Sequence, residues 1–521
     1  MLKNFRGRPS LKTVLQASTV AGLAAAVLAT GIPVEISRSY AEAVNVQSPS
    51  VPSFANVVDA VSPAVVSVRV ESRVKPASDD GDGFSFDFNG RGFDDLPDAL
   101  KPFFRQFGEQ GHQGQNQQRR FGQPGGPGRL RPVAQGSGFF ISEDGYIVTN
   151  NHVVSDGTAF VAVMNDGTEL DAKLIGKDPR TDLAVLKVDG KGRKFTYVNW
   201  ADDNKVRVGD WVVAVGNPFG LGGTVTAGIV SANGRDIGNG PYDDFIQIDA
   251  PVNKGNSGGP AFNTEGEVMG VNTAIYSPSG GSVGIAFSIP ASTVKSVVAQ
   301  LKDKGSVSRG WIGVQIQPVT SDIADSLGLK KAEGALVAEP QANGPAAKAG
   351  IESGDVITAV NDETVKDARE LARTIGSLAP GVSVKLNVLH KGQDKVVSLT
   401  LGQLPNAQEA KADNGDNGDR GSANRGTDVP KLGLTVAPAN SVAGAGKDGV
   451  VVTEVDPKSA AAERGFKEGD VILEVAGKSV ANATDVRDAI TAARADSKNS
   501  VLMRVKSGGQ SRFVAVPLAK G

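Results

Sequence analysis

Residues 253–260 read Asn-Lys-Gly-Asn-Ser-Gly-Gly-Pro, and this stretch determines how the rest of the chain is interpreted. A serine hydroxyl becomes a useful nucleophile only when a base takes its proton and nearby donors stabilise an oxyanion. Glycines around Ser257 let the backbone turn sharply and direct the N–H groups of Gly255 and Ser257, with that of Asn256 nearby, into one small volume. The stretch indicates a nucleophilic serine; the alternative is an ordinary turn in a chain with 65 glycines.

The base for this serine is sought among only three histidines. His152 follows a strand-like run at 145–151, where a rigid scaffold can hold an imidazole. His112 lies in a Gln/Gly-rich tract, and His390 ends an alternating strand just before a Lys-Gly turn. We expect His152 to be the base; the alternative is a structural histidine with satisfied hydrogen bonds.

A third group must orient the imidazole and stabilise its charged form. Asp182 opens the apolar run 183–188, and a carboxylate at the start of a buried strand needs a partner. Asp178 is the rival, but it precedes a proline and is interpreted as a turn residue. The order His, Asp, Ser along the chain is the chymotrypsin order.

The blocks around these residues resemble those of the Do-type (HtrA/DegP) serine proteases. The three active-site blocks are Thr-Asn-Asn-His-Val-Val, Thr-Asp-Leu-Ala-Val-Leu-Lys and Gly-Asn-Ser-Gly-Gly-Pro, and further blocks agree at 135–139, 214–220 and 284–290. The resemblance covers almost the whole chain after the leader. It implies a mainly β fold: a chymotrypsin-like protease domain of two six-stranded barrels with the triad in the cleft between them, followed by two PDZ domains.

The C-terminal part contains a repeat, because residues 334–357 match residues 449–472 and both copies include Gly-Asp-Val-Ile. Each copy has alternating strands and one predicted helix, at 368–377 and at 483–493. Two copies are too few for a solenoid. They are interpreted as two small α+β domains, and their context resembles PDZ domains.

PDZ domains bind an extended peptide as an added strand, with backbone N–H groups receiving its terminal carboxylate. The resemblance places the two carboxylate loops at Gly310, Trp311, Ile312 and Gly313, and at Leu432, Gly433 and Leu434. The bulky Trp311 narrows the first pocket. For the second copy, the alternative is a purely structural domain.

Bulk properties exclude several classes of function. A length of 521 residues corresponds to about three domains. The net charge of −2, without a basic stripe, predicts no nucleic-acid partner. The absence of cysteine excludes disulfides and thiol chemistry, and we expect neither a cofactor nor a metal.

The N-terminus has the pattern of a secretory signal peptide. Four basic residues precede the apolar, uncharged stretch 14–32, and small residues near position 41 form candidate cleavage sites. We expect a signal peptide at 1–41 and a periplasmic location. The alternative is a retained membrane anchor, although polar residues within the stretch make it a poor membrane span.

The predicted domain organisation follows from these segments: a protease domain at 42–307, a flexible loop within it at 76–132, a first PDZ domain at 308–403, a linker at 404–430 and a second PDZ domain at 431–521. The flexible loop is poor in aliphatic residues yet contains Phe103, Phe104 and Phe107. The resemblance implies that this loop enters a neighbouring subunit; the alternative is aggregation-prone disorder.

Two further groups of residues are assigned with the help of the resemblance. Apolar side chains predict a first substrate pocket that accepts small or medium aliphatic residues, lined by Thr273, Ala274, Ile275, Ile285, Ala286 and Phe287. Arg235 matches the arginine of the family's sensor loop, which relays peptide occupancy of the first PDZ domain; the alternative is a solvated turn.

The sequence therefore predicts a periplasmic serine endopeptidase that degrades unfolded or damaged proteins during stress, without ATP and with added chaperone activity. Its expected partners are unfolded proteins, C-terminal peptides, further copies of the chain in trimer-based assemblies and, transiently, a membrane surface. The alternative functions are a non-catalytic holdase chaperone and a PDZ scaffold with an inactive barrel.

Overall fold

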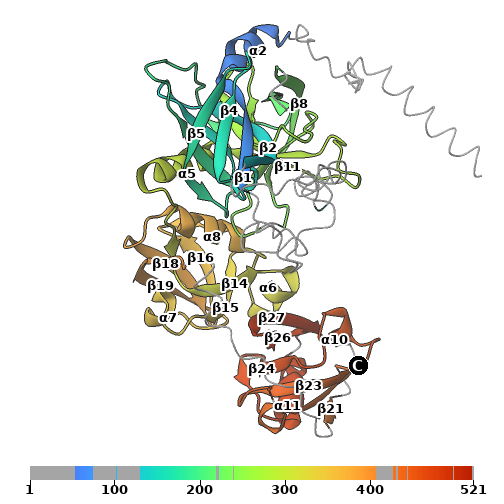
Figure 1. The fold of residues 1–521 in the computed structure, drawn as a ribbon. Helices are drawn as coiled ribbons and strands as arrows, with labels where there is room; N and C mark the ends of the chain where they lie inside the picture. The colour runs from blue at the N-terminus through green and yellow to red at the C-terminus, as the bar shows by residue number, and fades with distance from the viewer. Residues whose placement is uncertain are drawn as a thin grey trace, which may run out of the picture. The chain divides into compact units, whose positions relative to one another are not determined.

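The computed structural model in Figure 1 describes most of the chain after the leader. The described residues are 53–73, 101, 130–218, 222–238, 240–405, 426–429, 432–442, 444–496 and 498–518. The chain divides into two units, Met1–Ser53 and Phe54–Gly521. The predicted signal peptide, His112 and the three phenylalanines of the 76–132 loop lie outside the described residues. Within them, no helix has the length and apolar character needed to cross a bilayer.

Six antiparallel strands close into barrel 1, in the order β1-β2-β3-β6-β5-β4. Their β-branched and aromatic residues alternate between the barrel interior and its surface. The interior is filled by side chains such as Val68, Phe140, Ile147 and Leu186. The strands are β1 (Val65–Arg73), β2 (Leu130–Phe140), β3 (Tyr146–Asn150), β4 (Ala159–Val163), β5 (Glu169–Asp178) and β6 (Leu183–Val188).

Barrel 2 repeats this arrangement, in the order β10-β11-β12-β9-β8-β7. Its core includes Val212, Ile248 and Ile275, and a separate buried cluster joins Phe139 and Leu183 of barrel 1 to residues of barrel 2. The predicted pair of six-stranded barrels is therefore confirmed. The strands are β7 (Trp211–Gly216), β8 (Thr224–Arg235), β9 (Phe245–Ile248), β10 (Pro260–Phe262), β11 (Val268–Ile275) and β12 (Ala286–Pro290).

Short helices complete the two-barrel part: α2 (Ala55–Val61), α4 (Asn151–Val154) and α5 (Ala291–Lys304), with single 3₁₀ turns at Ser62–Ala64 and Asp203–Lys205. In helix α5, Val294, Val298 and Leu301 pack into the cluster shared by the barrels. Gly305, at φ 70°, ends the helix in the left-handed conformation that glycine adopts easily. Helix α2 was not predicted.

The first repeat forms a sheet in the order β14-β15-β16-β18-β19, and the short strands β13 and β20 pair separately. Helix α8 starts where the Asp367 side chain accepts the N–H of Glu370. The elements are β13 (Gly310–Trp311), β14 (Val314–Pro318), α6 (Ser321–Leu327), β15 (Ala335–Pro340), α7 (Pro345–Lys348), β16 (Val356–Val360), β17 (Glu363–Thr364), α8 (Ala368–Ser377), β18 (Ser383–His390), β19 (Gln393–Thr400) and β20 (Gly402–Gln403).

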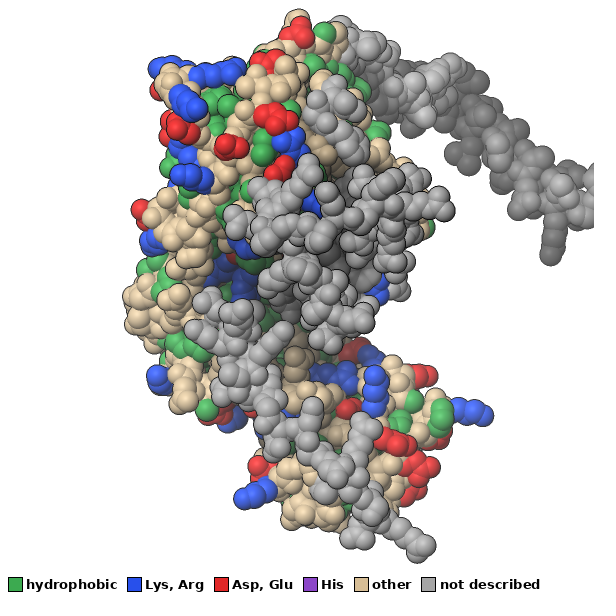
Figure 2. Space-filling view, viewed as in Figure 1, with side chains coloured by type: hydrophobic (Ala, Val, Ile, Leu, Met, Phe, Trp, Pro, Cys, Tyr) green, Lys and Arg blue, Asp and Glu red, His purple; other side chains and the backbone are tan. Residues whose placement is uncertain are grey.

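The second repeat forms a sheet in the order β21-β22-β23-β24-β26-β27. A capping box of Asn482 and Asp485 starts helix α11. A helix is present at each predicted position, α8 in the first repeat and α11 in the second. Among the described residues of the first repeat, no strand pairs with β14 as β21 pairs with β22. The elements are β21 (Thr427–Val429), β22 (Leu434–Pro438), a 3₁₀ turn (Ala439–Ser441), β23 (Val450–Val455), α10 (Ala460–Glu463), β24 (Val471–Val475), β25 (Lys478–Ser479), α11 (Ala483–Ala495), β26 (Ser500–Ser507) and β27 (Gln510–Pro517). Figure 2 shows basic and acidic side chains interspersed on the visible face of the described residues.

Candidate active site

His152 and Asp182 form a buried pair held within barrel 1. His152 lies in α4, directly after β3, and Asp182 lies in the turn between β5 and β6. The carboxylate accepts the backbone N–H of His152 at 2.9 Å and faces the imidazole Nδ1 at 2.7 Å. An ionised carboxylate only accepts, so Nδ1 carries the proton and Nε2 is the unprotonated ring nitrogen. The predicted pairing is present in the structure.

The backbone of Asp182 adopts φ 55°, which is uncommon for a residue other than glycine. Its carbonyl oxygen accepts the N–H of Asn151 at 3.0 Å and the side-chain amide of Asn150 at 2.9 Å. These bonds from the segment that carries His152 hold the turn in its unusual conformation. The orientation of the carboxylate is therefore fixed by the same element that presents the imidazole.

Ser257 is fully buried in the loop between β9 and β10 of barrel 2, and Thr273 of β11 connects it to the pair. The Ser257 hydroxyl lies 3.5 Å from the carbonyl oxygen of Thr273, while the Thr273 hydroxyl donates to Asp182 at 2.5 Å. Thr273 thus links Ser257 to Asp182 and, through that carboxylate, to His152. Thr273 was predicted only as part of the substrate pocket, and a polar Asn-Thr pair in a mostly apolar strand was the available signal.

The loop before Ser257 has the geometry expected of an oxyanion hole, with one correction. Gly255 adopts φ 93°, and a Cβ on it would lie 2.5 Å from Pro218. The N–H of Asn256 donates to the carbonyl of Asn253 at 3.0 Å. It is therefore engaged in a turn, and the prediction that it assists the oxyanion is wrong. The N–H groups of Gly255 and Ser257 remain the candidates.

Asp178 is not the turn residue that its proline neighbour suggested. It ends β5, is 5% exposed, and accepts both terminal nitrogens of Arg309 at 3.0 and 2.6 Å. Thr181 donates a further hydrogen bond to it at 2.5 Å. A buried carboxylate in this setting requires a paired cation. Asp178 therefore has a structural role in an ion pair with Arg309, and Asp182 is the carboxylate that contacts His152.

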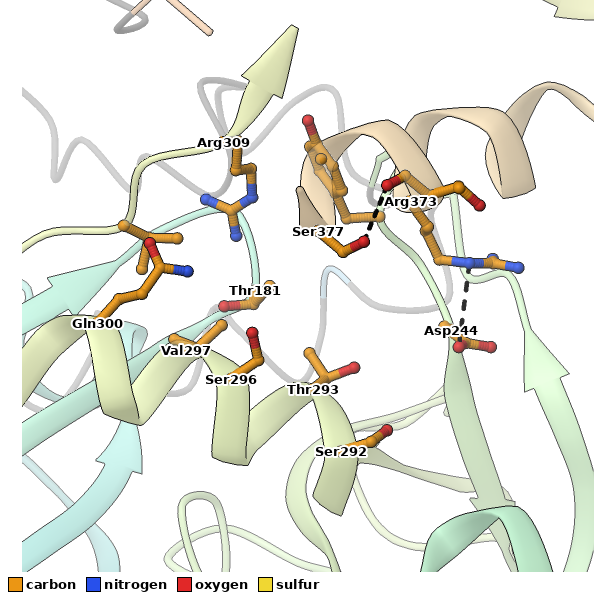
Figure 3. Close-up of a pocket in the computed structure, with 14 residues that line it drawn as sticks. Thr181, Asp244, Ser292, Thr293, Ser296, Val297, Gln300, Arg309, Arg373 and Ser377 are labelled. Atoms are coloured by element: carbon orange, nitrogen blue, oxygen red, sulfur yellow. Dashed lines mark hydrogen bonds and ion pairs between the residues drawn. The ribbon is translucent and has the colours of Figure 1, made fainter. Parts of the chain in front are cut away.

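A pocket lies beside this pair, lined by α5, the 242–244 segment and α8 (Figure 3). The guanidinium of Arg309 lies over the Tyr242 ring, 4.9 Å from its centroid. Burial raises the pKa of the Tyr242 phenol, which therefore stays protonated at neutral pH. Arg373 of α8 donates to the Asp243 carbonyl at 2.9 Å and lies 4.0 Å from the Asp244 carboxylate.

The predicted sensor arginine occupies a neighbouring position. Arg235 ends β8, and its Nε donates to the side chain of Gln247 at 2.8 Å. The next residue, Asp236, forms an ion pair with Arg369 of α8 at 2.8 Å. In this structure, acidic residues of the loop rather than Arg235 make the ion pairs with the first PDZ domain.

The six predicted substrate residues lie together on β11, β12 and the residue before β12. Ala274 is opposite Phe287, and Ile275 is opposite Ala286. Ala274, Ile275 and Ala286 are buried in the core of barrel 2, Phe287 is buried in the cluster shared by the two barrels, and Ile285 is partly buried. Of the six predicted residues, Ile285 is therefore the one with enough exposure to meet a substrate.

The first predicted carboxylate loop, 310–313, joins β13 to β14. Gly313 adopts φ 75°, and a Cβ on it would lie 3.0 Å from the Trp311 ring. Ile312 is buried, and its carbonyl accepts the N–H of Ala346. Among the described residues, β14 forms one end of its sheet order, so its outer side is available to an added strand.

At the second predicted carboxylate loop, 432–434, the neighbouring sheet edge is already covered by a strand. Strand β21 pairs antiparallel with β22, placing Val429 opposite Leu434 on the side away from β23. Val429 is 1% exposed, and Arg487 of α11 donates to the carbonyl of Asp428. The chain's own strand occupies the edge where an added peptide was expected.

His390 also departs from its expected role as a surface turn residue. Its Nδ1 lies 2.7 Å from the buried Asp355 carboxylate in the first repeat. The equivalent carboxylate of the second repeat, Asp470, accepts the hydroxyl of Ser507 instead. Both contacts tie the Gly-Asp-Val-Ile segment to the last hairpin, so His390 serves packing in the repeat.

Two barrels that bring a His–Asp pair to a glycine-flanked serine define a trypsin-like serine peptidase, here followed by two PDZ domains. A model described as "Trypsin-like peptidase domain" matches residues 136–271, and one described as "PDZ domain" matches 310–401 and 430–518. The chain belongs to the family of DegP-like periplasmic serine endoproteases, and it is a serine endopeptidase of the periplasm.

The relatives named "Probable periplasmic serine endoprotease DegP-like" align over nearly their whole length. The one from Rhizobium meliloti (strain 1021) is 59% identical over 511 residues, covering 98% of this chain and 100% of the relative. The one from Brucella melitensis biotype 1 is 58% identical over 521 residues, covering 99% and 98%. Among solved structures, "HtrA-type protease AlgW with decapeptide" is 35% identical with a TM-score of 0.54, covering 68% of this chain and 100% of its own.

Proposed function

We propose that His152, Asp182 and Ser257 are the catalytic triad of this endopeptidase. His152 takes the proton of Ser257 as the hydroxyl oxygen attacks the peptide carbonyl carbon, and then gives that proton to the departing amine. A water molecule then attacks the acyl-enzyme in the same way: His152 takes a proton from the water and returns it to the Ser257 oxygen as the acyl group leaves. Asp182 keeps the imidazole oriented, and the N–H groups of Gly255 and Ser257 stabilise the oxyanion.

One observation carries this proposal: Asp182 is bonded to His152 twice, and the same carboxylate meets Thr273, which contacts the Ser257 hydroxyl. A structural histidine would not require a buried carboxylate that also bonds the residue in contact with the Ser257 hydroxyl. The arrangement therefore favours catalysis over the holdase and scaffold alternatives.

The proposed substrates are unfolded or damaged proteins, cut without ATP, and the same chain also holds unfolded proteins without cutting them. The test incubates wild type, Ser257→Ala and the control Ser377→Ala with a reduced, alkylated protein. Ser377 is an exposed serine of α8. We expect cleavage by wild type and the control only, and suppression of aggregation by all three. Cleavage by Ser257→Ala would refute the triad, and aggregation in its presence would refute the holding activity.

We further propose cleavage after small or medium aliphatic residues. The residues around Ile285 are apolar, and none of the six predicted pocket residues carries a charge that would bind a basic or acidic side chain. A peptide-library profile should therefore show Val, Ala or Ile before the cut bond. A preference for Lys or Arg at that position would contradict this assignment.

The proposed peptide site is the outer side of β14 with its loop 310–313, and occupancy is relayed to the active site through the loop that carries Arg235. The ion pairs of Asp236 and Asp244 with α8 support such a connection. The solved HtrA-type relative carries a decapeptide. A fluorescent peptide with a free C-terminus should bind with one site per chain, because β21 covers the second edge, and Arg235→Ala should lose peptide-stimulated cleavage.

Two binding sites per chain in the wild type would contradict the role given to β21. Arg487→Ala removes the donor to Asp428 and should make the second edge available, raising the stoichiometry toward two. Retained stimulation in Arg235→Ala would contradict the relay.

We propose that the chain assembles as trimers through the Trp211 region. Trp211 is 41% exposed and Val208 63% exposed, and Phe54 packs edge-on against the Trp211 ring at 5.4 Å. Exposed apolar clusters of this kind are typical of protein interfaces. Light scattering should give a trimer or a multiple of it for wild type and a monomer for Trp211→Glu; a monomeric wild type would contradict the proposal.

Residues 1–41 are proposed to be removed as a signal peptide during export. The basic residues before an apolar stretch support this. Mass spectrometry of the protein purified from the periplasm should place the mature N-terminus just after position 41 or 43. An intact Met1 would support a retained anchor instead.

A further inference from the structure

Ser137 lies in β2 of barrel 1 and is fully buried, yet the proposed chemistry gives it no part. Its hydroxyl donates to the carbonyl oxygen of Gly255 at 2.5 Å and accepts the N–H of Asn217 at 2.9 Å. Its own N–H donates to the carbonyl of Ser257 at 2.8 Å. One residue of barrel 1 therefore holds the two carbonyls on either side of Asn256.

These bonds fix two peptide planes that flank a third, because the C=O and N–H of each peptide unit are rigidly linked. In the unit between Gly255 and Asn256, Ser137 holds the C=O and the Asn253 carbonyl holds the N–H. In the unit after Ser257, Ser137 holds the C=O, and the following N–H donates to a β11 carbonyl at 2.8 Å. The plane between these two units presents the N–H of Ser257.

The Ser137 hydroxyl has little freedom to do anything else. It has one proton, and its acceptor side is occupied by the Asn217 N–H, so the proton is directed at Gly255. The surroundings are tight: a Cβ on Gly216 would lie 3.0 Å from the Ser137 oxygen, and one on Gly258 would lie 2.3 Å from the Ser137 carbonyl. Removing the hydroxyl therefore leaves two buried polar groups without a partner.

We propose that Ser137 is the positioning residue of the oxyanion hole. From barrel 1 it fixes the peptide units on both sides of the one that carries the Ser257 N–H, so that this N–H points at the oxygen that becomes charged in the transition state, and it fixes the unit that follows the Gly255 N–H. This inference rests on the proposed function, because it assumes that Ser257 is the nucleophile. Preorganised donors of this kind act mainly on the transition state, so Ser137 affects kcat rather than substrate affinity.

The test compares full-length wild type, Ser137→Ala and Ser67→Ala. Ser67 is a matched control because it is fully buried, lies directly opposite Ser137 in the β1–β2 register, and contacts Gln135 rather than the loop. Hydrolysis of a short chromogenic peptide gives kcat and KM. Inhibition is measured with a peptidyl boronic acid and with the product peptide of the same sequence.

The boronic acid reports on the oxyanion hole. The Ser257 oxygen bonds to boron, its proton passes to His152, and a boron-bound oxygen takes the place of the oxyanion. For Ser137→Ala we expect kcat to fall about 10- to 100-fold, somewhat less than for loss of a whole oxyanion donor. The boronate Ki should rise by a similar factor, while KM and the product Ki stay within about twofold. Ser67→Ala should leave all four values within about threefold of wild type.

Three outcomes overturn the proposal: an unchanged kcat in Ser137→Ala, an equal loss of affinity for boronate and product, or an equal effect of Ser67→Ala. A wild type that neither cuts the peptide nor binds the boronate would instead refute the proposed function. If Ser137→Ala does not fold, Ser137→Cys decides, since its thiol is a weaker donor of similar size. Its kcat should fall at constant KM, and a wild-type kcat would overturn the proposal.

Discussion

Barrels 1 and 2 have the same strand order, yet they contribute to the site in different ways. Barrel 1 presents both members of the His152–Asp182 pair and bonds them to each other, and Thr273 of barrel 2 adds one hydrogen bond to the carboxylate. Barrel 2 presents Ser257 on a glycine turn whose carbonyls are held by Ser137 of the other barrel. The base and its orienting carboxylate thus depend mainly on bonds within barrel 1, whereas both carbonyls beside Asn256 in the nucleophile loop depend on contact between the barrels.

This difference separates two kinds of failure. Changes to the His–Asp pair remove proton transfer and leave the loop in place, whereas changes at the barrel contact disorganise the loop and leave the base intact. The following predictions test this division, beginning with the largest effect.

Removal of the base should have the largest effect. His152→Ala should lower kcat by about 10⁶, the scale seen when a triad member that works as a unit with the nucleophile is lost. His390→Ala is the matched control, because His390 contacts Asp355 in the first PDZ domain. Its kcat on a short peptide should stay within about twofold. Comparable losses in both variants would show that His152 acts through folding alone.

Asp182→Asn should lower kcat by about 10⁴, because an amide no longer fixes the imidazole tautomer that leaves Nε2 free of its proton. Asp171→Asn, on an exposed position of β5, serves as control and should be indistinguishable from wild type. Steady-state kinetics on one ester substrate and one amide substrate measure kcat for both variants. Activity within tenfold of wild type in Asp182→Asn would assign the orienting role to another residue.

Thr273→Val tests a direct bond from barrel 2 to the pair and should lower kcat about tenfold. It removes the hydroxyl that donates to Asp182 but keeps the backbone carbonyl near Ser257. A hydrogen bond to a charged group contributes about 1.5–3 kcal/mol, of which only part is felt in the transition state. Thr226→Val, whose hydroxyl bonds a carbonyl at the barrel surface, is the control. An unchanged kcat in Thr273→Val would show that the pair is independent of barrel 2.

Arg309→Met should have the smallest effect on short-peptide hydrolysis, within about threefold, because the pair with Asp178 lies behind the Asp182 turn rather than in the site. Its effect on stability is larger. Removing one partner of a buried ion pair lowers the free energy of unfolding by about 3–5 kcal/mol, because the Asp178 carboxylate stays buried without its cation. Denaturant unfolding should show the loss, and the double variant with Asp178→Leu should recover most of it. A double variant as unstable as the single one would contradict this account.

Sequence reasoning identified the repeat and the three residues of the proposed triad, because each has a local signature, whereas the two barrels were expected from the family resemblance. The glycines around Ser257, the strand before His152 and the apolar run after Asp182 are all contiguous patterns. Helix α8 was predicted with its observed bounds, and the structure adds that the Asp367 side chain caps its first turn.

The features that sequence reasoning missed depend on residues far apart in the chain. Asp178 is interpreted as a turn residue until Arg309, more than a hundred residues later, is placed beside it. The engaged N–H of Asn256 and the covered edge of β22 are likewise matters of backbone pairing, which composition does not reveal. Ser137 belonged to a noticed block, but its contacts with the Gly255 loop required the folded structure.

The central claim is that an imidazole from one barrel activates a serine from the other, and labelling with a peptidyl phosphonate tests it most directly. Intact-mass spectrometry and peptide mapping should find one adduct per wild-type chain, on Ser257, and none on His152→Ala over the same time. Equal labelling of both proteins, or an adduct on a different residue, would contradict the claim.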